Sequence, residues 1–165
     1  MENLDFRRTI LDKHVKIGTK LDYCYQCNKC TTKCPVATTI GDDKYNPRKL
    51  VLHSILGNMA NVMPASVGDV KVWGCTYCDT CDEVCPNNIE LTEIFYVIKN
   101  LLAKKKQLPE FYITQATTIR DNGKAIPLMD AIVRRREQMA LPTIPEPDKS
   151  KVQTIMKETG MENIL

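Results

Sequence analysis

The stretch Cys24-Tyr-Gln-Cys-Asn-Lys-Cys-Thr-Thr-Lys-Cys-Pro35 has the pattern C-x2-C-x2-C-x3-C-P, and Cys75-Thr-Tyr-Cys-Asp-Thr-Cys-Asp-Glu-Val-Cys-Pro86 repeats it. The two copies contain all eight cysteines of the 165-residue chain. Three thiols separated by two residues each can lie on one tight loop and point inward, while the fourth faces away. This run is typical of proteins that hold two [4Fe-4S] clusters. The sequence therefore predicts two such clusters.

The ligands of each cluster are predicted to come from both copies, because in two-cluster ferredoxins the fourth cysteine of a run binds the other cluster. The proline that follows each fourth cysteine fits this arrangement. It fixes φ and has no N–H to leave unpaired where the chain turns away. We therefore predict a first cluster on Cys24, Cys27, Cys30 and Cys85 and a second cluster on Cys75, Cys78, Cys81 and Cys34.

Disulfides and structural zinc are the two alternatives for these cysteines. The N-terminus has no apolar run of signal-peptide length, so we expect a reducing compartment, in which thiols bind metal. C-x2-C pairs also hold tetrahedral zinc, and zinc is the stronger alternative. Zinc ribbons, however, do not require a third and a fourth cysteine at these offsets, twice, each time before proline. Iron–sulfur clusters are the favoured interpretation.

The composition gives few signs of other partners. The formal net charge is +3, and two oxidised clusters would bring about two negative charges each, so no nucleic acid is implied. The basic runs at 104–106 and 134–136 are interpreted as solvated helix faces, with docking onto an acidic partner as the alternative. No apolar run approaches the ~20 residues that cross a bilayer. We expect the protein to be soluble, or held at a membrane only through another subunit.

Helical periodicity dominates the rest of the chain, which predicts an all-α fold. Asn46-Pro47 resembles an N-cap with proline at the first helical position, and Gly57 closes that segment, which predicts a helix over 47–57. The clearest amphipathic helix is expected over 91–102, followed by helical segments from Pro109 to Asn122-Gly123 and after Pro127. Only short β-favouring stretches such as 70–73 occur.

The predicted organisation has four parts: an N-terminal extension (1–20), a helical two-cluster ferredoxin domain (21–108), a helical extension (109–140) and a proline-rich linker with a C-terminal tail (141–165). Three prolines between 142 and 147 indicate an extended linker. The short apolar stripes of the two ends are each expected to fold back on the core or to dock on a partner. They comprise Phe6, Ile10, Leu11 and Val15 at one end, and Val152, Ile155 and Met156 at the other.

The sequence contains no motif that indicates a catalytic or nucleotide-binding site. Its seven glycines form neither G-x-G-x-x-G nor a P-loop, so no flavin, nicotinamide or nucleotide fingerprint is present. His14 and His53 are the only histidines, and neither lies beside a cysteine motif. No two cysteines are adjacent, so no unusual substrate-facing cluster is expected. These absences indicate an electron carrier, with catalysis on another subunit.

The two motifs differ in charge. Lys29 and Lys33 lie in the first, whereas Asp79, Asp82 and Glu83 lie in the second. Reduction adds negative charge to a cluster, and nearby lysines favour it. We hypothesise that the first cluster has the higher potential and accepts electrons from the second.

Several stretches resemble HdrC, an iron–sulfur protein of heterodisulfide reductase that is a member of the α-helical ferredoxin family. They are the string from Cys24 to Val36, Asn46-Pro47-Arg48, Trp73-Gly74-Cys75, the long helix after the second motif, and Thr117-Thr-Ile-Arg-Asp-Asn-Gly123. The resemblance covers residues 20 to 125. The iron–sulfur subunits of succinate dehydrogenase and anaerobic glycerol-3-phosphate dehydrogenase share the domain, but each has a further domain that this chain lacks.

The resemblance implies a place in a cytoplasmic complex of methanogenic archaea. There the chain would carry electrons from a flavin-containing subunit to a catalytic, cysteine-rich subunit that reduces the coenzyme M/coenzyme B heterodisulfide. Hydrogenase or formate dehydrogenase would lie upstream. The alternatives are a free two-cluster ferredoxin, or the relay subunit of a related sulfur-metabolism or respiratory dehydrogenase complex.

Overall fold

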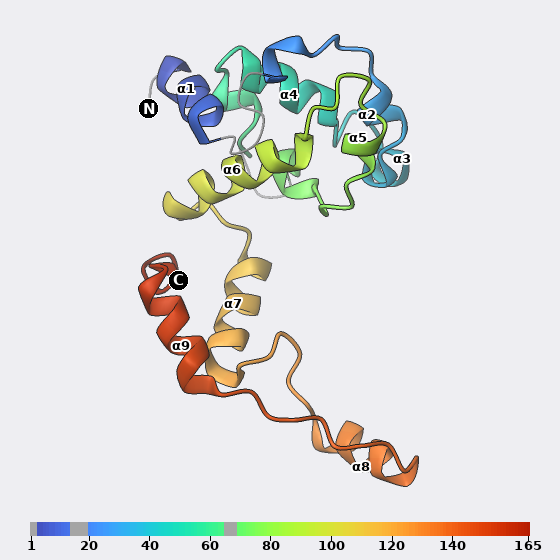
Figure 1. Cartoon of the computed structure of the whole chain (residues 1–165), viewed down its shortest axis with the longest axis vertical. Coiled ribbons are helices and arrows are strands. Elements are labelled where there is room, and N and C mark those ends of the chain that lie inside the picture. Colours follow the sequence, from blue (N-terminus) through green and yellow to red (C-terminus); the bar gives the residue numbers. More distant parts are fainter. Residues whose placement is uncertain (1–2, 14–19, 65–68) are drawn as a thin grey trace. The chain divides into compact units, whose positions relative to one another are not determined.

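The computed structural model describes residues 3–13, 20–64 and 69–165, and its described part is helical without strands. This confirms the predicted all-α class. The chain divides into two compact units, 1–102 and 103–165 (Figure 1). The first contains α1 (Asn3–Lys13), η1 (Lys20–Tyr23), α2 (Lys29–Thr32), α3 (Pro35–Ile40), α4 (Pro47–Ile55), η2 (Met59–Asn61), η3 (Lys71–Gly74), α5 (Thr80–Glu83) and most of α6 (Leu91–Lys104).

One hydrophobic core holds the first unit together. It collects apolar side chains from α1, α4 and α6 and from the segments around the cysteine motifs. Phe6 and Ile10 of α1 are fully buried in it, so the N-terminal apolar stripe folds back on the core. Arg7 reinforces this packing, because its Nε donates to the carbonyl of Ile55 at 2.8 Å. Leu11, also of that stripe, is partly buried against the core. Its last member, Val15, lies outside the described residues, as does His14.

Helix α4 matches the helix predicted over 47–57 and ends two residues earlier. Asn46 is its N-cap and accepts from Lys49 N at 3.0 Å, and Pro47 occupies the first turn. Gly57, with φ of 69°, follows in the left-handed region. The segment 70–73 forms no strand and lies largely in the 3₁₀ helix η3, which buries Val72 in the core. Residues that favour β-structure do not form a strand in so short a stretch when no other strand pairs with it.

Helix α6 is the amphipathic helix expected after the second motif. It buries Leu91, Ile94, Phe95, Ile98 and Leu102, as the periodicity predicts. It also buries Lys99, which the apolar pattern did not predict. Asp82 holds its start, because Oδ1 accepts from Leu91 N at 2.7 Å and from Thr92 N at 3.2 Å.

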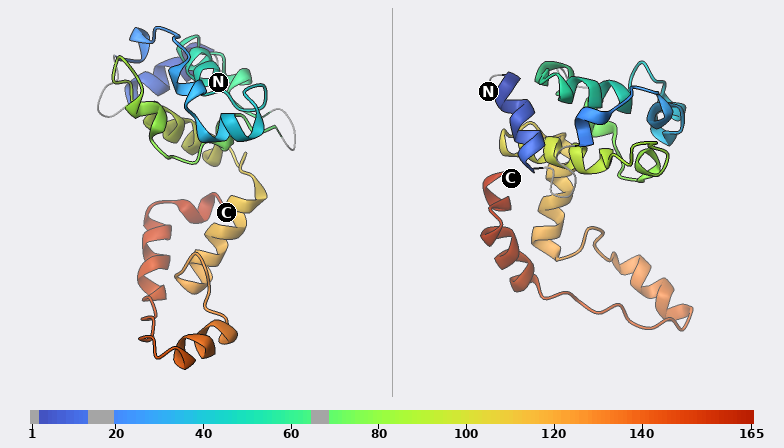
Figure 2. Two further views of the ribbon diagram at one scale, coloured as in Figure 1. Left: turned by 90° about the vertical axis from the view of Figure 1, so that its right-hand side faces the viewer. Right: turned by 45° about the horizontal axis from the view of Figure 1, so that its top comes forward.

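The second unit consists of the end of α6, α7 (Glu110–Asn122), α8 (Asp130–Gln138), α9 (Lys149–Glu158) and η4 (Met161–Asn163). Helices α7 and α9 lie side by side, and α8 lies apart from both (Figures 1 and 2). Gly123 ends α7 with φ of 70°, as the Asn122-Gly123 signal predicted. Residues 141–148 have no regular structure, as expected of the proline-rich linker. The tail forms α9, in which Met156 is buried and Ile155 is 59% exposed.

No helix among the described residues is long and apolar enough to span a membrane.

Candidate iron–sulfur site

The two cysteine loops follow the same backbone course. In the first, Gln26 and Asn28 have φ of 56° and 70°; in the second, Tyr77 and Asp79 have φ of 56° and 57°. These residues occupy matching places on either side of the second cysteine of each loop. Left-handed φ is uncommon for residues other than glycine, and it is tolerated best by Asn and Asp. The repeated left-handed turns bring the three cysteines of each loop around one space.

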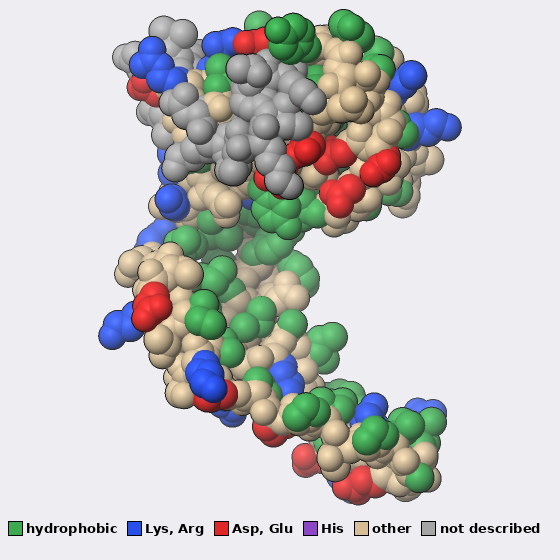
Figure 3. Space-filling model, in the orientation of Figure 1, with side chains coloured by type: hydrophobic (Ala, Val, Ile, Leu, Met, Phe, Trp, Pro, Cys, Tyr) green, Lys and Arg blue, Asp and Glu red, His purple; other side chains and the backbone are tan. Residues whose placement is uncertain are grey.

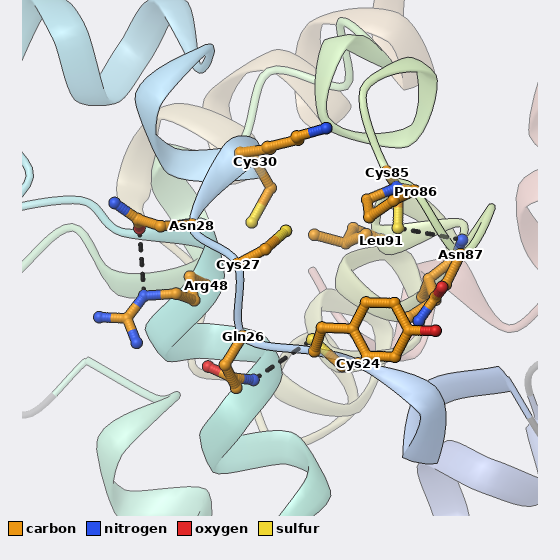
Figure 4. Close-up of a pocket in the computed structure, with 13 residues that line it drawn as sticks. Cys24, Gln26, Cys27, Asn28, Cys30, Arg48, Cys85, Pro86, Asn87 and Leu91 are labelled. Atoms are coloured by element: carbon orange, nitrogen blue, oxygen red, sulfur yellow. Dashed lines mark hydrogen bonds between the residues drawn. The ribbon is translucent and has the colours of Figure 1, made fainter.

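A first pocket is lined by the thiols of Cys24, Cys27 and Cys30 from the first motif and by Cys85 from the second. Figure 4 shows Cys27, Cys30 and Cys85 around the same space, with Leu91 beside them. The remaining wall includes the apolar side chain of Ile89, which is 2% exposed.

A second pocket has the complementary set, Cys75, Cys78 and Cys81 from the second motif and Cys34 from the first. The two motifs can exchange their fourth cysteines because α2 and α5, the short helices inside them, are in contact. The structure thus gathers the two groups of four cysteines that the sequence predicted. Which sulfurs bond to iron stays a prediction.

The surroundings of the thiols fit clusters with thiolate ligands. Ile89 N donates to Cys85 Sγ and Gln26 Nε2 to Cys24 Sγ, both at 3.3 Å. Such donors stabilise sulfur that carries negative charge. Among the described residues, no three Cys, His, Asp or Glu side chains meet closely enough to hold a single metal ion. In both pockets, the thiols come from two loops and line a shared space.

Burial keeps several of these thiols protonated without iron. It raises the pKa of Cys30 to about 11. It also raises the pKa of Cys75 and of Cys81, and the neighbouring Asp82 adds to the effect at Cys81. By contrast, hydrogen bonding to Thr80 lowers the pKa of the exposed Cys78. Because metals bind the thiolate, loading the buried cysteines must release protons.

Cys75 is contacted by residues from two distant parts of the sequence. The Tyr45 side chain, fully buried, is hydrogen-bonded to the Cys75 sulfur. Lys99 Nζ donates to the Cys75 carbonyl oxygen at 2.7 Å. Burial lowers the pKa of Lys99, and a negative charge on Cys75 would oppose this shift. Two residues outside the motif, Tyr45 and Lys99, therefore converge on one cysteine of the second pocket.

Helix α4 supports the first loop in a similar way. Thr31 Oγ1 bonds to Asn46 Oδ1 at 2.9 Å and accepts from Arg48 N at 3.2 Å. Arg48 lines the first pocket, and its Nε donates to Asn28 Oδ1 at 3.1 Å (Figure 4). The long segment between the two motifs thus braces the first cysteine loop through the Asn46-Pro47-Arg48 sequence.

The charged residues of the motifs are not equivalent in space. Lys29 lines the first pocket and Asp79 the second, and both are exposed, as is Lys33. Asp82 is engaged by the start of α6, whereas Glu83 is exposed. The predicted order of the two potentials stays a hypothesis.

Sequence reasoning missed Tyr45, Arg48 and Lys99 as neighbours of the pockets, because no spacing rule connects them to the cysteines.

The aromatic residues beside the cysteines divide into two kinds. Tyr23 and Tyr25 are 65% and 72% exposed, and Tyr25 lines the first pocket. Tyr77 instead stacks on Tyr96 of α6, with ring centroids 3.9 Å apart. His53 lies on α4, outside both cysteine pockets.

Comparison with known proteins places these observations in a family. The model of the 4Fe-4S dicluster domain matches residues 20–89. A CoB–CoM heterodisulfide reductase iron–sulfur protein of the HdrC type from Methanocaldococcus jannaschii is 30% identical over 148 residues, which cover 86% of this chain and 75% of that protein.

Two further relatives of the same type extend this likeness. The one from the H₂:CoB-CoM heterodisulfide, ferredoxin reductase of Methanothermobacter thermautotrophicus is 25% identical over 90% of this chain and 80% of its own length. The one from the ferredoxin/F420H₂-dependent CoB-CoM heterodisulfide reductase of Methanosarcina acetivorans is 31% identical over 78% of this chain and 75% of its own length. With its repeated cysteine loops in a helical core, the chain belongs to the HdrC family of heterodisulfide reductase iron–sulfur proteins.

Proposed function

We propose that the chain is the electron-transfer subunit of a heterodisulfide reductase complex, an oxidoreductase in which it is not itself the catalyst. It relays electrons through two [4Fe-4S] clusters to the subunit that reduces the coenzyme M/coenzyme B heterodisulfide in methanogenesis. The observation that supports this most is the pair of four-cysteine pockets within one core, in a chain of this family.

Cys24, Cys27, Cys30 and Cys85 would hold the first cluster, and Cys75, Cys78, Cys81 and Cys34 the second. The clusters, when bound, supply one-electron redox chemistry. The protein contributes hydrogen bonds to the sulfurs and apolar walls that limit contact with water, which are the means by which a protein sets a cluster's potential. Both pockets share one small core, which suits transfer between the clusters.

The proposed partners are a flavin-containing subunit that delivers electrons and a cysteine-rich catalytic subunit that receives them, in the cytoplasm. The names of the relatives specify different electron sources: H₂ or formate for the protein of Methanococcus maripaludis, and ferredoxin for that of Methanosarcina mazei. For this chain we propose hydrogenase or formate dehydrogenase upstream.

Four single Cys→Ser variants test the ligand sets. If the fourth cysteines are exchanged, C27S and C85S will alter the same EPR signal of the reduced protein, and C34S and C78S will alter the other. If C34S instead altered the signal affected by C27S, each motif would bind its own cluster, and the assignment would be wrong.

Anaerobic affinity purification of the tagged chain from its own cells tests the function. We expect co-purification with a flavoprotein and a cysteine-rich subunit, and about eight irons per chain from two [4Fe-4S] clusters. Recovery alone as a brown monomer would instead indicate a free ferredoxin, and a colourless product would contradict the iron–sulfur assignment.

A further inference from the structure

Lys99 is the only charged side chain that is buried among the residues whose burial the structure describes; it is 5% exposed. It lies in the third turn of α6, 24 residues from Cys75 along the chain. Burying a charge is costly unless neighbouring groups compensate for the lost water. The groups around Lys99 should therefore reveal why a cation occupies this place.

Three groups that the structure shows around Lys99 belong to the second cysteine motif or flank it. Nζ donates to the Cys75 carbonyl oxygen at 2.7 Å. It lies over the Tyr77 ring, 4.3 Å from the centroid, and 5.4 Å from the centroid of Trp73. An ammonium group is attracted to the faces of aromatic rings. The position of the charge is therefore fixed directly against the loop that begins at Cys75.

A cation in this position acts electrostatically on a cluster that the loop holds. Reduction adds one negative charge to a cluster, and a buried cation stabilises that charge more than an exposed one does, because water and salt screen it less. Lys29 and Lys33 of the first motif are both exposed. The strongest electrostatic effect of a lysine is thus expected at the second pocket.

We infer that Lys99 raises the reduction potential of the cluster held by Cys34, Cys75, Cys78 and Cys81. The inference rests on the proposed function, since it requires a cluster in that pocket. It gives the second cluster a stabilising charge that the motif sequences do not reveal, and it opposes the order of potentials predicted from Lys29 and Lys33.

Lys99→Met tests the inference, because methionine has a similar length and no charge. The midpoint potential of each cluster is measured by EPR-monitored titration of the anaerobic full-length protein, with the two signals assigned by the C27S and C78S variants. We expect at least a tenfold fall in the equilibrium constant for one-electron reduction of the second cluster, which equals about 59 mV. The first cluster should change much less. The shift should persist in ~1 M salt, where exposed charges are screened within about 3 Å.

Two variants serve as controls. Lys104→Met removes an exposed lysine at the end of the same helix and should leave both potentials unchanged. Lys99→Arg keeps the charge, so the potential of the second cluster should stay close to the wild-type value. Two results would overturn the inference. One is equal potentials of the second cluster in Lys99→Met and the wild type. The other is a shift in Lys99→Arg as large as that in Lys99→Met. Loss of iron from both Lys99→Met and Lys99→Gln would also overturn it, by giving Lys99 a structural role. A wild-type protein without clusters would instead refute the proposed function.

Discussion

Gly74 makes room for the aromatic ring that supports Cys75. A Cβ at this position would lie 2.6 Å from Tyr45 Cδ2 and 2.5 Å from Val70 Cγ1. Both distances are far shorter than a van der Waals contact, and Tyr45 is too deeply buried to move without disturbing the core. Gly74 is therefore needed for close packing against the second cysteine loop.

We predict that Gly74→Ala destabilises the iron-loaded protein by about 1–3 kcal/mol, the usual effect of overpacking a core. Anaerobic thermal melting would show the loss. In a Tyr45→Leu background the same exchange should have a smaller effect, because the rigid ring is gone. A melting temperature that Gly74→Ala leaves unchanged would show that the Tyr45 ring does not limit this site.

His53 should make stability depend on pH. Its Nδ1 is buried and has no hydrogen-bond partner. Burial, followed by the charges of Lys71 and Lys49, holds its pKa below 6.5. The unfolded chain therefore binds the proton more readily than the folded one. The stabilisation is complete above the unfolded pKa and is lost as the pH falls through it toward the folded pKa.

His53→Gln should accordingly flatten this part of the pH profile. We expect the melting temperature of the wild type to fall more than that of the variant between about pH 7.5 and 5.5, on either side of the histidine pKa. Acid damage to the clusters affects both proteins and cancels in the comparison. Parallel profiles for the two proteins would disprove a role for His53.

At the scale of the element, α6 shows how the second motif is tied to the core. Asp82 lies within the motif, yet its carboxylate accepts from the backbone amides of Leu91 and Thr92 and also bonds to Thr92 Oγ1. A carboxylate at this place satisfies amides that have no partner within the helix and complements the helix dipole. The same helix then returns Lys99 to Cys75.

Asp82→Ala should therefore destabilise the protein by about 0.5–2 kcal/mol, as expected when a helix cap is lost. Glu83→Ala is the matched control, because Glu83 is the adjacent acidic residue and is exposed. Anaerobic melting of the two variants makes the comparison. Equal losses in both would mean that general motif charge, rather than capping of α6, is responsible.

Local signals predicted the helices well, but not the side chains that reach the pockets. Asn46-Pro47, the apolar period of 91–102 and Asn122-Gly123 each act within a few residues, so their helices could be expected from the sequence. The cysteine spacing likewise predicted which thiols share a pocket. Tyr45 and Lys99 reach Cys75 through tertiary packing, which periodicity does not contain. Lys99 even interrupts the apolar pattern that would have suggested burial.

At the scale of the whole molecule, the two units differ in what they bury. All eight cysteines and, among the described residues, every buried hydrophobic side chain except Met156 lie within 1–102. The second unit exposes many apolar side chains instead (Figure 3). The largest exposed fractions are those of Ile126, Phe111, Met129 and Met139. The buried core of residues 1–102 can hold clusters. The exposed apolar helices of the second unit are typical of a surface that binds protein.

This division predicts that a fragment of residues 1–108, which retains all of α6, folds and keeps both clusters. Anaerobic expression of the fragment should yield about eight irons per chain and both EPR signals, since each [4Fe-4S] cluster requires only cysteines of this part. The fragment should fail to co-purify with the partner subunits that the full-length chain retains, because it lacks the apolar surfaces of α7 and α8. A fragment without iron would show that 109–165 is required for the cluster domain to fold. A fragment that still binds every partner would place the docking surface within 1–108, and the exposed side chains of the second unit would then need another explanation.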